Sequence, residues 1–148
     1  MQRKILIISI FIIILCCDQF SKWIVRQKLP IDKSIPIIDN IVSITHTMNT
    51  GAAFGILSNR RFFLITVSLI SMIIILWGVL KYTLPGTLIV PTGLLLGGIS
   101  GNLCDRITRG YVTDFIEVKY FSVFNIADAA VTIGTLLILI SLIFTWKK

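Results

Sequence analysis

Four long stretches without charged residues constrain this chain more than any other feature of its sequence. Three of them, at 62–80, 82–104 and 129–146, contain 19, 23 and 18 residues. A helix needs about 20 predominantly apolar residues to cross the hydrocarbon core of a bilayer. The first stretch, at 5–17, approaches that length only if its helix continues past two charged residues to residue 25. We therefore expect four transmembrane helices, at about 5–25, 62–81, 84–106 and 126–146.

The composition supports a membrane protein and excludes several other classes. Of the 148 residues, 55% are hydrophobic and only 14% are charged, whereas about 25% of a soluble domain is charged. The length suits one polytopic domain, 1–148. The net charge of +7 is spread over single residues and pairs, so we expect contact with anionic lipid and no nucleic acid. His46 is the one histidine, and no Cys/His spacing fits zinc, so we expect no metal and no other cofactor.

Two connections between the expected helices are longer than simple turns, at about 26–61 and 107–125. In the first, residues 41–48 are rich in β-branched side chains and alternate between two faces. The two faces would carry Val42, Ile44, His46 and Met48, and Ser43, Thr45 and Thr47. We expect a small β-sheet there, lying on the membrane surface, and a loop in the second connection, which holds Asp114 and Glu117. The predicted fold is an all-α membrane protein with a small β element.

Polar side chains interrupt three of the expected helix ends, although a charged group at membrane depth costs roughly 2.5–3.5 kcal/mol. They recur three and four residues apart, so that each set lies on one helical face. The sets are Asp18, Ser21 and Lys22; Asn102, Asp105 and Arg106; and Asn125 and Asp128. Since they end the first and third helices and begin the fourth, we expect all three sets at one membrane level. Such a coincidence points to a functional site.

Two pairs within these sets allow a structural and a functional role equally. Asp18 and Lys22 could form only a structural ion pair. Asp105 and Arg106 could anchor a helix end at the lipid head groups. The sequence around these pairs does not decide between the two roles.

Asp114 and Asp128 differ from these pairs because neither has a basic residue three or four positions away. Two carboxylates brought together in a low-dielectric site cannot both ionise easily, so they share a proton. The ionised one can then deprotonate a water while the neutral one acts as an acid. This arrangement is typical of aspartic proteases. A serine or cysteine nucleophile is not expected, because the one histidine lies in the expected sheet.

Glycines occur in two contexts that have different meanings. Gly97 and Gly101 form a small-xxx-small pair on an expected helix, which is typical of close helix packing in membranes. Gly51 opens the sequence Gly-Ala-Ala-Phe-Gly at 51–55, outside any long span. We expect a tight re-entry into the bilayer there, at a place where a substrate backbone passes closely.

Five short blocks match, in order, the sequence motifs of one known family. The blocks are Asp-Gln-Phe-Ser-Lys at 18–22, Asn-Thr-Gly-Ala-Ala-Phe-Gly at 49–55, Gly-Ile-Ser-Gly-Asn-Leu-Cys-Asp-Arg at 98–106, Val-Thr-Asp-Phe at 112–115 and Phe-Asn-Ile-Ala-Asp at 124–128. With these blocks, the chain resembles the bacterial lipoprotein signal peptidases, or signal peptidase II, over nearly its full length. Each block alone is weakly specific, but five in order on the expected helix ends are a specific match.

The resemblance implies an intramembrane aspartic endopeptidase with four transmembrane helices, both termini in the cytoplasm and the sheet outside it. The active site would lie near the outer leaflet of the bacterial cytoplasmic membrane. Its substrates would be prolipoproteins carrying diacylglycerol on a cysteine, cut just before that cysteine, without a metal. Asp114 and Asp128 match the catalytic pair. The positions that match residues shaping the site are Asp18, Lys22, Asn49, Asn102, Arg106 and Asn125, and Gly51 and Asp105 belong to the same blocks.

Charge counting and two other function classes compete with this interpretation. The expected loops place five basic residues on the side of the termini and seven on the other, which weighs against cytoplasmic termini, but we follow the resemblance. A small transporter or channel would instead carry polar residues at mid-membrane depth and inverted repeats. A structural subunit would tolerate Asn in place of both aspartates. Since a closed four-helix unit needs no partner, we expect a monomer.

Overall fold

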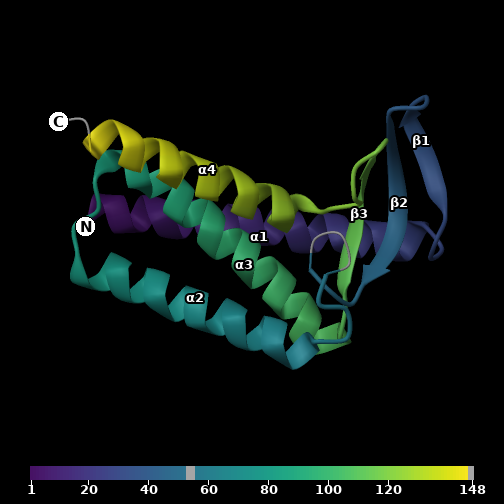
Figure 1. Ribbon diagram of the computed structural model, residues 1–148, viewed down its shortest axis with the longest axis horizontal. Helices are drawn as coiled ribbons and strands as arrows, with labels where there is room; N and C mark the ends of the chain where they lie inside the picture. Colours follow the sequence, from purple (N-terminus) through teal and green to yellow (C-terminus); the bar gives the residue numbers. More distant parts are fainter. Residues whose placement is uncertain (53–55, 147–148) are drawn as a thin grey trace.

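The computed structural model describes residues 1–52 and 56–146, and its described part is a bundle of four long helices with a small sheet at one end (Figure 1). All four helices are long and apolar enough to cross a membrane. The start of α1 and the end of α4 lie at the end of the bundle opposite the sheet. The predicted fold class is therefore confirmed. The helices are α1 (Gln2–Lys28), α2 (Arg61–Lys81), α3 (Ile89–Arg109) and α4 (Ile126–Trp146), with a short 3-10 helix η2 (Gly86–Leu88) before α3.

The first helix accepts two charges because both are taken out of contact with lipid. Asp18 and Lys22 are 0% exposed and face the other helices of the bundle. Arg26 and Lys28 occupy the last turn of α1, where basic side chains interact favourably with the helix dipole. The helix therefore continues well past the uncharged stretch at 5–17.

Helix α3 is the centre of the bundle, and its glycines allow the other helices to approach it. A Cβ atom on Gly97 would lie 2.6 Å from the Cβ of Ile14 in α1, which is closer than side chains pack. A Cβ atom on Gly101 would overlap the carboxylate of Asp18. Helix α2, by contrast, packs chiefly on α3 and forms one side of the bundle (Figure 1).

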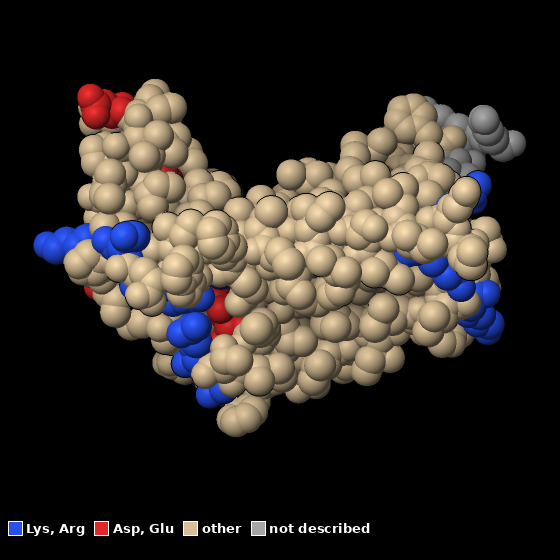
Figure 2. Space-filling view, turned by 180° about the vertical axis from the view of Figure 1, so that it is seen from behind, with Lys and Arg blue, Asp and Glu red and all other residues tan. Residues whose placement is uncertain are grey.

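The surface of the bundle has the charge distribution of a protein that crosses a bilayer. Figure 2 shows a broad band without charged groups between two ends that carry Lys and Arg. Large apolar side chains on α2 and α4, such as Ile73 and Phe144, are more than half exposed. Lipid tails rather than water suit such a surface.

The sheet has three antiparallel strands in the order β1 (Ser34–Ile38), β2 (Val42–Asn49) and β3 (Val112–Val118). The expectation of a loop in the second long connection is wrong at β3. Four of the seven residues in its sequence, Val-Thr-Asp-Phe-Ile-Glu-Val, are β-branched, and β2 offers it an open edge. This pairing places Asp114 opposite Thr47, so the strand carries the aspartate toward the helices.

His46 joins the sheet to the end of α1. Its side chain is buried, and Nδ1 lies 2.7 Å from the carbonyl oxygen of Leu29, just after the helix. The histidine thus has the packing role that ordinary core histidines have, and it fixes the sheet across the end of the bundle.

Candidate active site

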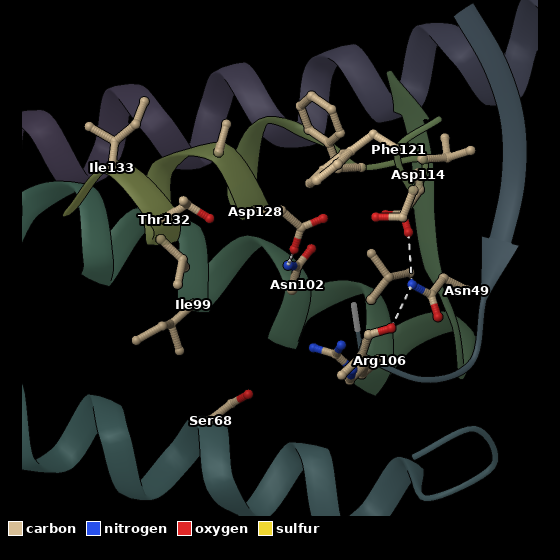
Figure 3. A pocket seen from close by; sticks show the side chains of 17 residues that line it. Asn49, Ser68, Ile99, Asn102, Arg106, Asp114, Phe121, Asp128, Thr132 and Ile133 are labelled. Atoms are coloured by element: carbon tan, nitrogen blue, oxygen red, sulfur yellow. Dashed lines mark hydrogen bonds between the residues drawn. The ribbon is translucent and has the colours of Figure 1, made fainter. Parts of the chain in front are cut away.

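A cavity of about 650 Å³ lies between the sheet and the adjoining ends of the helices. Figure 3 shows Asp114 on β3 and Asp128 on α4 pointing toward each other across it. Ser68 of α2 faces the cavity from the opposite side. Other side chains that line it come from β2, α3, α4 and the segment before α4: Asn49, Ile99, Asn102, Arg106, Phe121, Thr132 and Ile133.

Asn125 holds the two aspartates together. Its Nδ2 donates to Asp114 Oδ1 at 2.6 Å, and its backbone N–H donates to Asp128 Oδ2 at 3.2 Å. Its Oδ1 accepts from the backbone N–H of Asp128 at 2.9 Å, as a side-chain cap of the first turn of α4 does. One residue therefore sets the position of both carboxylates.

Each of the four carboxylate oxygens accepts one N–H. Asn49 Nδ2 donates to Asp114 Oδ2 at 2.9 Å, and Asn102 Nδ2 donates to Asp128 Oδ1 at 2.7 Å. With the two bonds from Asn125, the donors come from β2, α3 and the start of α4. The orientation of both carboxyl groups is thus fixed by three separate parts of the chain.

The pKa of Asp114 is raised from its ordinary value to about 6, chiefly because its side chain is buried. The nearby negative charge of Asp128 raises this pKa further. Hydrogen bonds from Asn49 and Asn125 and the positive charge of Lys22 oppose the shift. Asp114 therefore holds a proton at a pH where an ordinary aspartate has lost it.

A buried ion network lies next to Asn102 and the start of α4, and so supports the pair of Asp114 and Asp128. The ammonium group of Lys22 lies 2.8 Å from Asp18 Oδ2, 3.2 Å from Asp105 Oδ2 and 2.9 Å from Asn102 Oδ1, and all three charged side chains are 0% exposed. Asp18 also accepts the backbone N–H of Ala127 at 2.9 Å, and so reaches the start of α4. The network links α1 and α3 to the helix that carries Asp128.

The structure gives different roles to the two pairs that the sequence left open, Asp18 with Lys22 and Asp105 with Arg106. Asp18 and Lys22 do form an ion pair, but Lys22 also contacts Asn102, a neighbour of Asp128. Asp105 and Arg106 point in different directions. Asp105 binds Lys22 and is buried, while Arg106 donates to the carbonyl oxygen of Gly51 at 3.0 Å. An anchoring role for an Asp105–Arg106 pair at the head groups is therefore wrong.

Gly51 begins a tight turn beside the cavity. A Cβ atom there would lie 2.6 Å from the carbonyl oxygen of Ile56. The backbone N–H of Gly51 donates to Asn49 Oδ1 at 2.8 Å. Because this bond holds the side-chain oxygen on the Gly51 side, the side-chain NH2 group of Asn49 faces Asp114. The rest of the expected re-entry, Ala53, Phe54 and Gly55, lies outside the described residues.

Several side chains on the helical walls of the cavity, among them Ser68 and Thr132, were not predicted from the sequence. Thr132 lies one turn after Asp128 on α4, so its spacing of four residues was a usable signal. Ser68 is a polar residue inside an apolar helix, but Ser71, the other serine of α2, does not line the cavity. Within residues 1–52 and 56–146, no three His, Cys, Asp or Glu side chains gather as a metal site requires.

Comparison with known proteins gives one consistent result. The family model described as "Signal peptidase (SPase) II" matches residues 10–144. The chain is 40% identical over 141 residues to a lipoprotein signal peptidase of Halothermothrix orenii, covering 94% of each chain. It also resembles two solved bacterial membrane enzymes. One is 34% identical, with a TM-score of 0.88, covering 93% of this chain and 87% of that one. The other is 35% identical, with a TM-score of 0.83 and coverages of 92% and 91%.

The family match spans α2 and α3 in full and most of α1 and α4, and it includes both aspartates of the cavity and the asparagines that bind them. The likeness to solved membrane enzymes extends over the sheet as well as the helices, since it covers more than nine-tenths of the chain. This chain belongs to the signal peptidase II family and is a membrane peptidase.

Proposed function

We propose that the chain is an aspartic endopeptidase that removes the signal peptide from diacylglyceryl-modified prolipoproteins, cutting just before the lipidated cysteine. Family membership supplies the reaction class. The observation that carries the proposal is the joint placement of Asp114 and Asp128, which share Asn125 and line one cavity. Two carboxyl groups so arranged share a proton, as an aspartic protease requires.

The proposed reaction uses one water and the single proton of the pair. The ionised carboxylate takes a proton from water while the water oxygen bonds to the scissile carbonyl carbon. The neutral carboxyl group gives its proton to the carbonyl oxygen. When the tetrahedral intermediate collapses, the C–N bond breaks and the leaving amine takes the proton that came from water. The second carboxyl recovers its proton from the hydroxyl group of the intermediate, so the pair ends as it began.

Eight further residues are proposed to shape this site and to hold the substrate or the aspartates. Asn49, Asn102 and Asn125 donate to the carboxyl oxygens. Arg106 brings a positive charge to the cavity and also binds the turn at Gly51. The buried ion network completes the group with Asp18, Lys22 and Asp105.

The proposed setting is a single membrane domain that acts as a monomer, with both termini in the cytoplasm. The sheet and the cavity lie together at the other end of the bundle, so the aspartates would sit near the outer leaflet (Figure 1). The apolar walls at Ile99 and Ile133 suit acyl chains that remain in lipid while the peptide reaches the aspartates. This arrangement also favours proteolysis over transport, because the buried charged groups gather at one end of the bundle.

The test uses the purified full-length chain in detergent with a diacylglyceryl-modified prolipoprotein and the same prolipoprotein without lipid. We expect cleavage before the cysteine of the modified substrate only. Asp114→Asn and Asp128→Asn should each abolish cleavage, while Asp39→Asn, the same change on an exposed turn, should leave it intact. Cleavage should continue with chelator present. Full activity of either aspartate variant, in a folded protein, would show that the catalytic assignment is wrong.

A further inference from the structure

A second cavity, of about 520 Å³, lies at the end of the bundle that carries the chain termini. The first turns of α1 form one wall, and the end of α2 and the connection to α3 form the other. The residues that line it are Met1, Gln2, Arg3, Lys4, Ile7, Val79, Tyr82, Thr83 and Leu84. The cavity is far along the bundle from Asp114 and Asp128, and the proposed proteolysis does not use it.

Among the residues that the structure describes, the charged side chains that line this cavity are all basic. Arg3, Lys4 and Met1, which carries the N-terminal amine, line it. Lys81, the last residue of α2, lies in the sequence between the lining residues Val79 and Tyr82. The sequence has no acidic residue before Asp18 and none from residue 40 to residue 104, so no acidic side chain belongs to either wall. Figure 2 shows basic groups and no acidic ones at this end of the face in view. These basic side chains would attract an anion.

Two of these cations are held in place with donors to spare. Arg3 Nη1 donates to the carbonyl oxygen of Leu84 at 2.8 Å, and Lys4 Nζ donates to the carbonyl oxygen of Leu80 at 3.0 Å. A guanidinium group has five N–H donors and an ammonium group three, so one carbonyl each does not exhaust them. Met1 offers no side-chain cap to α1, and the positive end of that helix adds to the attraction.

The depth and the lining of the cavity indicate which anion fits. The Lys81 ammonium lies 4.5 Å from the centre of the Trp77 ring and 5.5 Å from that of Tyr82, and such aromatic residues mark the level of the lipid head groups. The lining also contains apolar side chains, of which Ile7 and Val79 are buried and Leu84 is partly buried. We propose that this cavity binds the phosphate head group of an anionic phospholipid, with the start of an acyl chain against these apolar side chains.

Such a lipid would add to the contact between α1 and α2, where Ile7 and Val79 belong to one hydrophobic cluster. Arg3 and Lys4 of α1 already cross to carbonyl groups at the end of α2 and beyond it. A phosphate between them would neutralise the two cations and strengthen this contact. The expected consequence is a higher thermal stability of the protein when the lipid is bound.

The test measures lipid binding by native mass spectrometry and by the thermal unfolding midpoint of the full chain in neutral detergent. The probes are a short-chain phosphatidylglycerol, the matching phosphatidylcholine and inorganic phosphate. We expect phosphatidylglycerol alone to bind and to raise the midpoint. The double variant Arg3→Gln/Lys4→Gln should bind it about tenfold more weakly, because each basic residue contributes to lipid attraction. Lys28→Gln/Lys33→Gln removes two exposed charges near the sheet and should bind as the parent does.

A second variant keeps the test decisive if the double variant does not fold. Thr83→Glu retains both cations but adds a carboxylate to the cavity wall, and it should weaken binding similarly. Equal binding by the parent and a folded cavity variant would overturn the proposal. So would equal weakening in the Lys28/Lys33 variant, which would indicate a general charge effect. If inorganic phosphate binds as tightly as phosphatidylglycerol, the site takes free phosphate and the lipid assignment is wrong.

Discussion

The ammonium group of Lys22 lies 2.9 Å from the side-chain oxygen of Asn102, and this contact determines which way the Asn102 amide faces. An ammonium group can only donate, so the Asn102 oxygen must face Lys22. The NH2 group is then turned toward Asp128, 2.7 Å from its Oδ1. A lysine that is 0% exposed and away from the cavity therefore orients a donor to the proposed catalytic pair.

Replacing Asn102 with Asp should separate these two contacts. The new carboxylate still accepts from Lys22, so we expect the protein to fold. It cannot donate to Asp128, and it brings a like charge against that carboxylate, so cleavage should fall by about 10²-fold or more. The measurement is the rate of prolipoprotein cleavage by the purified variant. Asn40→Asp, the same change on an exposed turn, serves as the control. Unchanged cleavage by Asn102→Asp would mean that this hydrogen bond has no part in the reaction.

Lys22→Met should lower the free energy of unfolding of the protein, and not only its activity. It leaves the carboxylates of Asp18 and Asp105 buried without their shared cation, and breaking a buried ion pair in this way costs about 3–5 kcal/mol. The free energy of unfolding in mixed micelles measures the effect. Lys28→Met, an exposed change in the last turn of the same helix, should cost less than about 0.5 kcal/mol. Equal stability of the two variants would contradict a structural role of the network.

The pH dependence of stability should reveal the raised pKa of Asp114. Because this pKa is about 6 in the folded protein and 3.8 ordinarily, the folded state binds more protons than the unfolded state between these values. Stability is therefore favoured below pH 3.8 and is lost as the pH rises through 6. Asp114→Asn removes this titration. From pH 4 to pH 8 the variant should gain on the parent by about 2–3 kcal/mol, measured as the difference between their free energies of unfolding. A constant difference over this range would show that Asp114 has no raised pKa.

Gly97→Ala should destabilise the bundle through its contact with α1. The added methyl would lie 2.6 Å from the Cβ of Ile14, and such overpacking costs about 1–3 kcal/mol. Gly78→Ala is the matched control, because nothing lies within 4 Å of a Cβ at that position of α2. Unfolding midpoints of the two variants in the same detergent decide the comparison. A midpoint of Gly97→Ala as high as that of Gly78→Ala would argue against close packing of α1 on α3.

The helices were predictable because lipid imposes a simple rule on them. An uncharged stretch of about 20 residues has few alternatives to a transmembrane helix. The polar sets around Asp18, Asn102 and Asp128 were also informative, because charges in such a helix need partners. The structure brings all three sets together at the sheet end of the bundle.

The contacts within the site could not be predicted from spacing alone. That Lys22 contacts Asn102 depends on how α1 and α3 are rotated against each other, and this rotation is set by the packing of Gly97 on Ile14. Strand β3 was missed because its seven residues include two charged ones, Asp114 and Glu117, and are equally typical of a loop. Its conformation is decided by pairing with β2, which is distant in the sequence.

The four N–H groups that bind the aspartates leave a defined set of acceptor positions on the carboxyl oxygens free. Two ionised carboxylates would offer about eight lone-pair directions; a proton shared by the pair takes one, and asparagines of the protein already occupy four. Only the rest can receive a water or a carbonyl group. In the proposed reaction, the directions left open are set by Asn49, Asn102 and Asn125 before any peptide arrives. The resting protein, and not the substrate, would then fix the geometry of attack on the scissile bond.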